Sequence, residues 1–306
     1  MIRRPPRSTQ SRSSAASDVY KRQEVLTYFL LHDYLSCTML ASLIFTLYVM
    51  PLTVLGSGSF WVTDKVSASA FLLDTGSKKI LIDCGPGTLA KLSRAGFRPS
   101  ELDYIFITHF HPDHTSDLYP LFVNFRLADI FKPGSITRFP MFFGPEGMSA
   151  FMSETARLTE LPAYDNWGKI KVETYQPEMQ FDNFTVKTFN VTHMSFGHHA
   201  RSYALRFEVQ GKAIAFSGDA ARCRGLQDVC QNADLFVCDA SFPGEMKGDV
   251  HVNALEIGEI AQKGNVKKVM LSHFNDHFAD FDLPAEVRQG YMGAVVKARD
   301  LEVVEV

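Results

Sequence analysis

Four potential metal ligands lie within six residues of one another in the stretch Thr108–His114, which reads Thr-His-Phe-His-Pro-Asp-His. Neutral imidazole and carboxylate side chains together suit zinc, and they also accept iron or manganese. The alternative interpretation is a polar loop in which histidines cluster without a ligand. The spacing favours a metal site, because more residues of the same types follow apolar runs later in the chain.

The residues before this stretch explain how its side chains can converge. The apolar run Tyr104–Ile107 predicts a β-strand that leads into it. Alternate residues of an extended chain point to the same face, so His109 and His111 can bind one metal ion at the end of the strand. A proline then ends the extended run, which places Asp113 and His114 on the following turn. There they can serve a second metal ion.

Three further potential ligands, His193, Asp219 and His273, come shortly after apolar runs that predict strands. Functional side chains commonly collect at such strand ends. Taken singly, each of the three is more typical of an ordinary polar residue at the end of a strand. Taken together, in this order after the first stretch, they predict one metal site.

The elements that must position these residues follow from apolar runs and turn signals. Strands are predicted at residues 51–55, 68–73, 79–83, 104–107, 138–143, 169–175, 184–189, 201–209, 213–216, 235–238 and 268–271. Helices are predicted at residues 88–95, 116–127, 147–158 and 253–263. Each half of the chain begins with strands and continues with strands and helices in alternation. This order fits two sheets sandwiched between helices.

The glycine-rich turn Gly56–Ser59 follows the first predicted strand. It lacks the lysine and the spacing of a phosphate-binding loop, so it predicts a tight turn near the site. Phe60 and Trp61 come directly after it and either wall the pocket or pack in the core. His198 and His199 lie on a later loop, where they either touch substrate or are solvated.

The composition is that of an ordinary globular protein, with 46% hydrophobic and 21% charged residues among 306. Residues 1–23 resemble a translated sequencing adapter; the alternative is a basic arm that binds nucleic acid. This segment carries six of the 31 Lys and Arg residues and one of the 34 acidic residues, which leaves a net charge of −8 on the rest. An acidic body argues against broad, nonspecific nucleic-acid binding.

Residues 24–49 contain an apolar run that is long enough for a signal-peptide core but short for a membrane span. We predict translated upstream sequence there, with Met50 as the natural start; the alternative is a genuine leader. Residues 50–306 are then a single domain without a membrane segment. Four cysteines in that part lack paired or zinc-finger spacing, which predicts reduced thiols in a cytoplasmic protein: Cys84, Cys223, Cys230 and Cys238.

With these residues in view, the chain resembles the metallo-β-lactamase superfamily, and within it ribonuclease Z and short phosphodiesterase-like members. The resemblance covers Leu52 to about Phe274. The motifs that carry it are Leu55–Ser59, Ile80–Thr88, Ile105–His109, Phe143–Gly147, Phe216–Asp219 and Leu271–Phe274. The fold that this resemblance implies is of the α+β class, an αββα four-layer sandwich with the site at one edge of the two sheets.

The resemblance also implies a role for each ligand. The residues assigned to a first zinc ion are His109, His111 and His193. The residues assigned to a second zinc ion are Asp113, His114 and His273, and Asp219 bridges the two ions. Two metals about 3.5–4 Å apart can share a hydroxide, which is then a nucleophile at neutral pH. Asp113 can also orient that hydroxide.

Further residues distinguish subfamilies. β-Lactamases of this superfamily lack a bridging carboxylate at the position of Asp219, so antibiotic hydrolysis is not expected as the main activity. Ribonuclease Z-like proteins have a carboxylate and a histidine that assist the leaving group, at positions matched here by Asp239 and His251. The family usually has Glu where this chain has Asp239. The alternative is that Asp239 pairs locally and His251 only begins a helix.

The function predicted is that of a dinuclear zinc-dependent hydrolase, a phosphodiesterase similar to ribonuclease Z, with a metal-bridging hydroxide as nucleophile. The alternatives are a lactonase, thioesterase or sulfatase of the same superfamily, and a non-catalytic metal-binding module. Members that process tRNA carry a basic arm, for which the span between Gly147 and His193 has no room. A small-molecule or nucleotide-like ester is therefore favoured over tRNA. Dimerisation is common in the family, so a homodimer is a further expectation.

Overall fold

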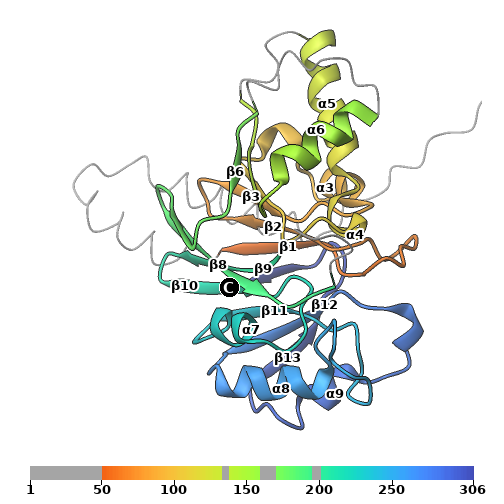
Figure 1. Cartoon of the computed structure of the whole chain (residues 1–306), viewed down its shortest axis with the longest axis vertical. Coiled ribbons are helices and arrows are strands. Elements are labelled where there is room, and N and C mark those ends of the chain that lie inside the picture. The colour runs from red at the N-terminus through yellow and green to blue at the C-terminus, as the bar shows by residue number, and fades with distance from the viewer. Residues whose placement is uncertain (1–49, 133–137, 159–169, 195–200) are drawn as a thin grey trace, which may run out of the picture. The chain divides into compact units, whose positions relative to one another are not determined.

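Two β-sheets face each other in the computed structural model of the chain, which describes residues 50–132, 138–158, 170–194 and 201–306 (Figure 1). The predictions for residues 1–23 and 24–49, and for His198 and His199, fall outside these described residues. Val49–Val306 forms one compact unit. Among the described residues, each sheet contains seven strands.

The first sheet has the strand order β14-β1-β2-β3-β4-β5-β6. Its strands are β1 (Pro51–Gly56), β2 (Ala70–Asp74), β3 (Lys79–Ile82), β4 (Tyr104–Phe106), β5 (Met141–Gly144), β6 (Val172–Thr174) and β14 (Val303–Glu305). Strands β1, β2 and β3 pair antiparallel, and β14 pairs antiparallel with β1. From β3 to β6 the pairing is parallel, so these four strands end at the same edge.

The second sheet repeats this plan in the order β13-β12-β11-β10-β9-β8-β7. Its strands are β7 (Glu178–Gln180), β8 (Phe184–Val191), β9 (Ser202–Val209), β10 (Lys212–Phe216), β11 (Leu235–Asp239), β12 (Lys268–Ser272) and β13 (Ala294–Lys297). Strands β7 to β10 are antiparallel neighbours, and β10 to β13 are parallel neighbours. Both sheets thus begin with antiparallel strands and continue with strands joined by helices, as the sequence order predicts.

Apolar side chains fill the space between the sheets. Phe71 and Phe106 of the first sheet lie in one buried cluster with Phe207, Phe216 and Met270 of the second. The rings of Phe71 and Phe216 are 5.4 Å apart, and those of Phe106 and Phe207 are 5.2 Å apart. Alternation along each strand sends these residues inward and their neighbours toward the helices. The shared core therefore keeps the two sheets in register at the edge where the site forms.

Helices cover the outer faces of both sheets (Figure 1). On the first sheet they are α3 (Thr88–Arg94), α4 (Pro112–Thr115), α5 (Leu118–Phe131) and α6 (Met148–Leu158), with the short 3-10 helix η1 (Pro99–Glu101). On the second sheet they are α7 (Arg224–Val229), α8 (Ala254–Lys263) and α9 (Leu283–Val287), with η3 (Asp276–Phe278) nearby. Separate apolar clusters hold each helical layer to its sheet. This is the predicted αββα sandwich, so the fold prediction is confirmed.

Every predicted strand and helix has a counterpart within the described residues, but some elements are missing from the prediction. Strands β7, β13 and β14 are three or four residues long and mostly exposed, so they lack the apolar runs by which the others are recognised. Helices α7 and α9 are similarly short. No helix in the described parts of the chain is long and apolar enough to cross a membrane.

Candidate metal centre

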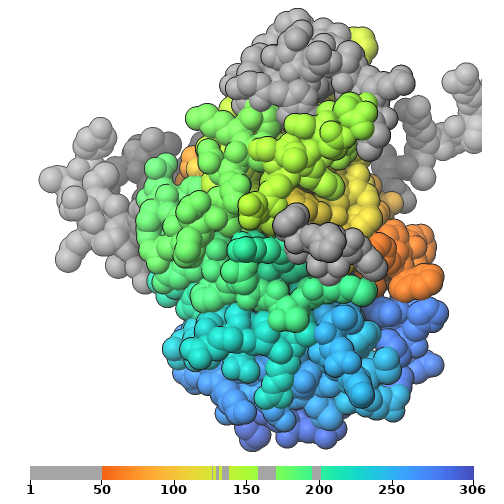
Figure 2. All heavy atoms as spheres, in the orientation of Figure 1, coloured from red at the N-terminus to blue at the C-terminus, as the bar shows by residue number. Residues whose placement is uncertain are grey.

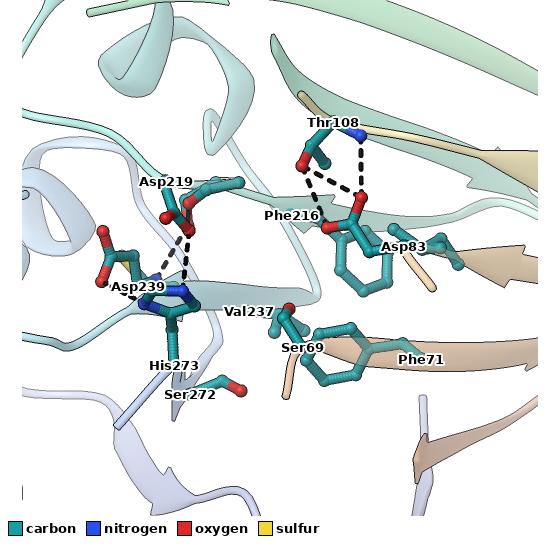
Figure 3. A pocket seen from close by; sticks show the side chains of 14 residues that line it. Ser69, Phe71, Asp83, Thr108, Phe216, Asp219, Val237, Asp239, Ser272 and His273 are labelled. Carbon is teal, nitrogen blue, oxygen red and sulfur yellow. Dashed lines mark hydrogen bonds and ion pairs between the residues drawn. The ribbon is translucent and has the colours of Figure 1, made fainter. Parts of the chain in front are cut away.

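The predicted ligands gather where strands of both sheets end. His109 follows β4, Asp219 follows β10 and His273 follows β12. Since these strands run parallel to their neighbours, their C-terminal ends meet at one edge of the sandwich. Asp219, Asp239 and His273 lie together at this edge, with Asp83 and Thr108 opposite them across the pocket (Figure 3).

The one-turn helix α4 brings two further ligands into the same place. His111 is its extended N-cap residue, and Pro112 is its first residue, where a missing N–H costs nothing. Asp113 and His114 follow on the helix and are 1% exposed. Gly85 allows the close packing, because a Cβ atom there would lie 1.9 Å from the Asp113 carbonyl oxygen. The sequence predicts only a turn at this point.

We call His109, His111, His193 and Asp219 the first cluster; their potential ligand atoms all lie within 4.8 Å of one another. His193 Nε2 is 3.1 Å from His111 Nδ1. Asp219 Oδ2 is 3.7 Å from both His109 Nε2 and His193 Nε2. His111 is only half-buried, whereas the His193 side chain is 2% exposed, so the first cluster approaches the surface at His111.

We call Asp113, His114, His273 and Asp219 the second cluster; it obeys the same 4.8 Å limit and is buried throughout. His273 Nε2 lies 3.1 Å from Asp113 Oδ2 and 3.3 Å from His114 Nε2. The other oxygen of Asp219, Oδ1, is 3.2 Å from His114 Nε2 and 3.3 Å from His273 Nε2. Asp219 therefore presents one oxygen to each cluster.

The donor set fits metal ions. Two buried side-chain atoms at this site, His109 Nε2 and Asp113 Oδ1, make no hydrogen bond within the described residues, and Asp219 Oδ1 has only the ion-pair contacts with His114 and His273 given above. A buried polar atom without a partner is costly. Such atoms among converging imidazoles and carboxylates are accounted for if cations accept their lone pairs. The residues present are those that hold zinc, manganese or iron in proteins.

The electrostatics of the two clusters differ. Burial, together with nearby His114, holds the pKa of His109 well below its usual range. Burial also lowers the pKa of His273, but surrounding carboxylates, Asp219 first among them, outweigh burial and raise it to about 10. Burial raises the pKa of Asp219, but the imidazoles of His273 and His114 outweigh it and hold the pKa well below its usual range. The carboxylates of the second cluster thus favour positive charge among them.

Two residues absent from the predicted site orient the imidazoles. Asp83 Oδ2 lies 2.7 Å from His114 Nδ1, and Thr108 donates to Asp83 from both its backbone N–H and its hydroxyl. Thr108 Oγ1 also lies 3.0 Å from His109 Nδ1. Partners on the remote ring nitrogen fix the tautomer and aim the other nitrogen at the metal. The signal in the sequence is that Asp83 is itself a carboxylate directly after a predicted strand.

Similar support reaches the remaining histidines from the second sheet. The carbonyl oxygen of Val250 is 2.9 Å from His193 Nδ1 and accepts a hydrogen bond from the Nδ1–H of that ring. The Ser241 hydroxyl lies 2.8 Å from His273 Nδ1 and donates to Asp239 Oδ1 at 2.7 Å. His273 also has a positive φ of 60°, which is rare for a residue with a side chain. The surrounding hydrogen bonds hold this ligand in its unusual conformation.

Asp239 and His251 form a pair beside both clusters. His251 Nδ1 lies 2.6 Å from Asp239 Oδ2, and the Asp239 side chain is fully buried. The His251 ring is 4.9 Å from that of His193 and 5.6 Å from that of His273. Burial lowers the pKa of His251, but the Asp239 carboxylate outweighs burial and raises it. The structure thus brings together the two residues that the sequence singles out as assisting a leaving group.

The loop with Phe60 and Trp61 lies outside the core. The side chains are 59% and 51% exposed, so packing in the core is the wrong alternative for them. The ring of Trp61 contacts the ring of His277 edge-on, with centroids 4.8 Å apart. His277 belongs to the segment just after the ligand His273.

Comparisons with known proteins find relatives over most of the chain. The chain is 27% identical over 250 residues to the "Probable metallo-hydrolase YhfI" of Bacillus subtilis, which covers 80% of this chain and 96% of that protein. It is 26% identical over 298 residues to the "Ribonuclease Z" of Streptomyces coelicolor, covering 84% of this chain and 98% of that protein.

Solved structures show the same fold. The crystal structure of the metallo-β-lactamase fold protein YhfI from Bacillus subtilis superposes with a TM-score of 0.69 at 22% identity, over 85% of this chain and 100% of that one. The short form of human tRNase Z superposes with a TM-score of 0.64 at 22% identity, over 83% and 98% of the two chains.

Fold, relatives and site together define the class: the chain is a metal-dependent hydrolase of the metallo-β-lactamase superfamily, similar to ribonuclease Z. A family model described as "Anti-Pycsar protein Apyc1" matches residues 50–299. Since this match spans most of the chain, the protein belongs to that family.

Proposed function

We propose that the protein is a dinuclear zinc-dependent phosphodiesterase. The observation that carries this proposal is that two His/Asp clusters share Asp219, with one carboxylate oxygen directed to each. A shared carboxylate is what two adjacent metal ions need, because it neutralises charge and ties the ions together. Manganese or iron would fit the same donors.

The residues that would hold the ions are those of the two clusters. The first ion would take His109, His111 and His193, the second Asp113, His114 and His273, and both would share Asp219. When bound, two such ions polarise a phosphoryl oxygen and lower the pKa of a coordinated water to about 7. Asp113 has a second, unpartnered oxygen, Oδ1, with which it can accept a hydrogen bond from the attacking water.

His251 is the proposed general acid. Asp239 accepts a hydrogen bond from His251 Nδ1–H, which leaves Nε2 as the nitrogen that can donate a proton to a leaving oxygen. Asp239 also raises the pKa of His251, so the ring carries its proton closer to neutral pH. The ring lies beside His193 and His273, one from each cluster, where a leaving group would depart.

A small phosphodiester or nucleotide-like ester is the proposed substrate class. Relatives named ribonuclease Z and a neighbour described as a diphosphatase from the PhnP family support chemistry at phosphorus. The described residues between Gly147 and His193 build α6, β6, β7 and β8. The predicted lack of an RNA-gripping arm concerns residues 159–169 as well, which fall outside the described residues. That expectation and the acidic body favour a small substrate over tRNA.

Other features of the protein remain predictions. The described cysteines are all free thiols, which supports the proposed cytoplasmic location. The homodimer stays a prediction. A lactone, thioester or sulfate ester would use the same two clusters, so these activities are the alternatives, and a binding module without turnover is the third.

A substrate-class screen of the zinc-loaded full chain tests the proposal. Bis(4-nitrophenyl) phosphate should be hydrolysed, and a lactone, a thioester and 4-nitrophenyl sulfate should be poor substrates. Turnover of one of these three esters without phosphodiesterase activity would contradict the proposed substrate class. Bound zinc without turnover of any class would support the binding module instead.

A further inference from the structure

The loop between β1 and β2 concentrates exposed apolar side chains. Phe60, Trp61 and Val62 are 59%, 51% and 43% exposed in three consecutive positions. Single exposed apolar residues are ordinary, but an exposed run that includes two aromatic rings calls for a binding role. In Figure 2 this loop is the orange surface, and it borders surface coloured blue, the colour of the last part of the chain.

Backbone hydrogen bonds attach this loop to the metal centre. Phe274 directly follows the ligand His273; its N–H donates to the Ser57 carbonyl at 3.0 Å, and its carbonyl accepts from the Ser59 N–H at 3.1 Å. Trp61 then contacts the ring of His277. We call Phe60, Trp61 and His277 the aromatic wall. It is built from the loop after β1 and the segment that follows His273, and the hydrogen bonds at Phe274 tie this loop to the edge where the two clusters lie.

A buried ion pair holds the base of the loop. Asp300 accepts hydrogen bonds from Ser57 N–H at 2.9 Å, from the Ser57 hydroxyl at 2.8 Å and from Ser67 N–H at 2.8 Å. The Lys91 ammonium donates to Asp300 at 2.7 Å and to the Lys65 carbonyl at 3.0 Å. Lys91 and Asp300 are 8% and 4% exposed in their side chains. Both ends of the loop are therefore fixed, and a surface that is fixed before binding loses less entropy on binding.

We propose that the aromatic wall determines specificity by stacking against a nucleobase carried by the ester substrate, with Trp61 as the main contact. The proposal rests on the proposed phosphodiesterase function. Bases stack on aromatic side chains with little regard to sequence, because every base has a flat π face. A substrate whose phosphorus lies at the two clusters can place its nucleobase against the aromatic wall.

The size of the patch favours this occupant over a protein. A stable protein interface needs about 800 Å² and about 20–30 residues on each partner. Three consecutive apolar side chains and one histidine form a much smaller surface, which suits one nucleobase ring. A second copy of the chain is the alternative occupant, and the experiment includes that outcome.

Kinetics with two matched substrates test the proposal in the zinc-loaded full chain. Thymidine 5′-(4-nitrophenyl) phosphate carries a base, whereas methyl 4-nitrophenyl phosphate does not. Trp61→Ala should raise KM about tenfold for the thymidine ester, with kcat within about twofold, and should leave KM for the methyl ester unchanged. Trp61→Phe keeps an aromatic ring, so its KM for the thymidine ester should stay close to that of the native chain. Phe131→Ala is the matched control: Phe131 is 80% exposed at the far end of α5, and its removal should change neither KM.

A binding measurement separates this proposal from the proposed function. Trp61 is one of two tryptophans, so a Trp167→Phe background makes its fluorescence a direct probe. Adenosine 5′-monophosphate should quench it, and ribose 5-phosphate, which lacks the base, should not. Quenching without phosphodiesterase activity would support the wall and contradict the proposed function. Three results would contradict the proposal that the aromatic wall binds a nucleobase. They are equal quenching by both compounds, equal KM changes for both esters, and a Trp61→Ala variant in which only the oligomeric state changes.

Discussion

The two clusters share Asp219 but differ in their exposure and in the direction in which the pKa values of their histidines are shifted. The first is partly open at His111, which is half-buried, and burial lowers the pKa values of His109 and His111. The second is buried throughout, and carboxylates around it raise the pKa values of His114 and His273 against the effect of burial. Burial thus favours the neutral imidazoles of His109 and His111 in the first cluster, whereas the second cluster attracts positive charge in the interior.

This difference suggests a division of labour within one centre. Oriented carboxylates reach the second cluster from Asp83 and, through Ser241, from Asp239. Such outer partners strengthen metal binding. We infer that the second cluster holds its ion more tightly, while the first cluster is where water and substrate enter. The predictions below test this contrast.

Removing the shared residue should have the largest effect. Asp219→Ala takes one ligand from each cluster, so kcat/KM for bis(4-nitrophenyl) phosphate should fall at least about 1,000-fold, since several kcal/mol of charge stabilisation are lost. Steady-state kinetics measure this change. Asp228→Ala, which alters an aspartate in a surface ion pair with Arg224, is the control and should keep full activity. Retained activity in Asp219→Ala would contradict the shared site.

The second largest effect concerns His251, which borders both clusters. His251→Ala should lower kcat about 100-fold for a phosphodiester with an alkyl leaving group, and only slightly for one that releases 4-nitrophenolate, which needs no proton. In the native enzyme the alkyl reaction should slow as pH rises through the raised pKa of His251, because the protonated ring is lost. An equal loss for both leaving groups would indicate a structural role.

Removing support from one cluster should affect that cluster more than the other. Asp83→Asn weakens the hold on His114, so affinity for the second metal ion should fall about 10–100-fold, with the first ion less affected. Competition with a chelator measures both affinities. Asp103→Asn is a matched control, because Asp103 is a buried carboxylate that precedes β4, at the opposite end from His109. It should lower stability without changing metal affinity.

The smallest expected effect is a difference between the two clusters in the number of protons that each releases when zinc binds. The pKa of His273 is about 10 in the metal-free protein, so at pH 7 its ring is protonated and must lose that proton to bind a metal. The raised pKa stabilises the metal-free fold fully below about pH 6.5, and this contribution is lost as pH rises through about 10.

Zinc titration in buffers of different ionisation enthalpy measures this release by calorimetry. Binding at the second cluster should release protons and tighten as pH rises from 6 to 8. The first cluster, with lowered pKa values for His109 and His111, should release few. Equal proton release from both clusters would contradict the electrostatic contrast.

The sequence singles out the residues of the two clusters because several of them follow apolar runs. His109, His193, Asp219 and His273 are each recognisable as polar residues shortly after such a run, and the sandwich follows from the order of the runs. Asp83 has the same signal, but its role depends on a contact with His114 that lies 31 positions away. Long-range pairing of this kind has no periodicity to reveal it.

The parts that the sequence misses depend on tertiary context. Strand β14 is three residues long and exists because it pairs with β1 at the other end of the domain. The anchor of the aromatic wall is likewise non-local, since Asp300 bonds to Ser57 and Ser67. The exposure of Trp61 also follows from that anchoring, and so the sequence leaves both interpretations of this residue open.

Counting metal ions tests the central claim most directly. The zinc-loaded full chain, dialysed and measured by elemental analysis, should hold two ions per chain. His193→Ala, which removes a first-cluster ligand, should hold one ion, and so should His273→Ala from the second cluster, whereas Asp219→Ala should hold fewer than two. One ion or none in the native chain, or two ions in both histidine variants, would contradict a dinuclear centre built on Asp219.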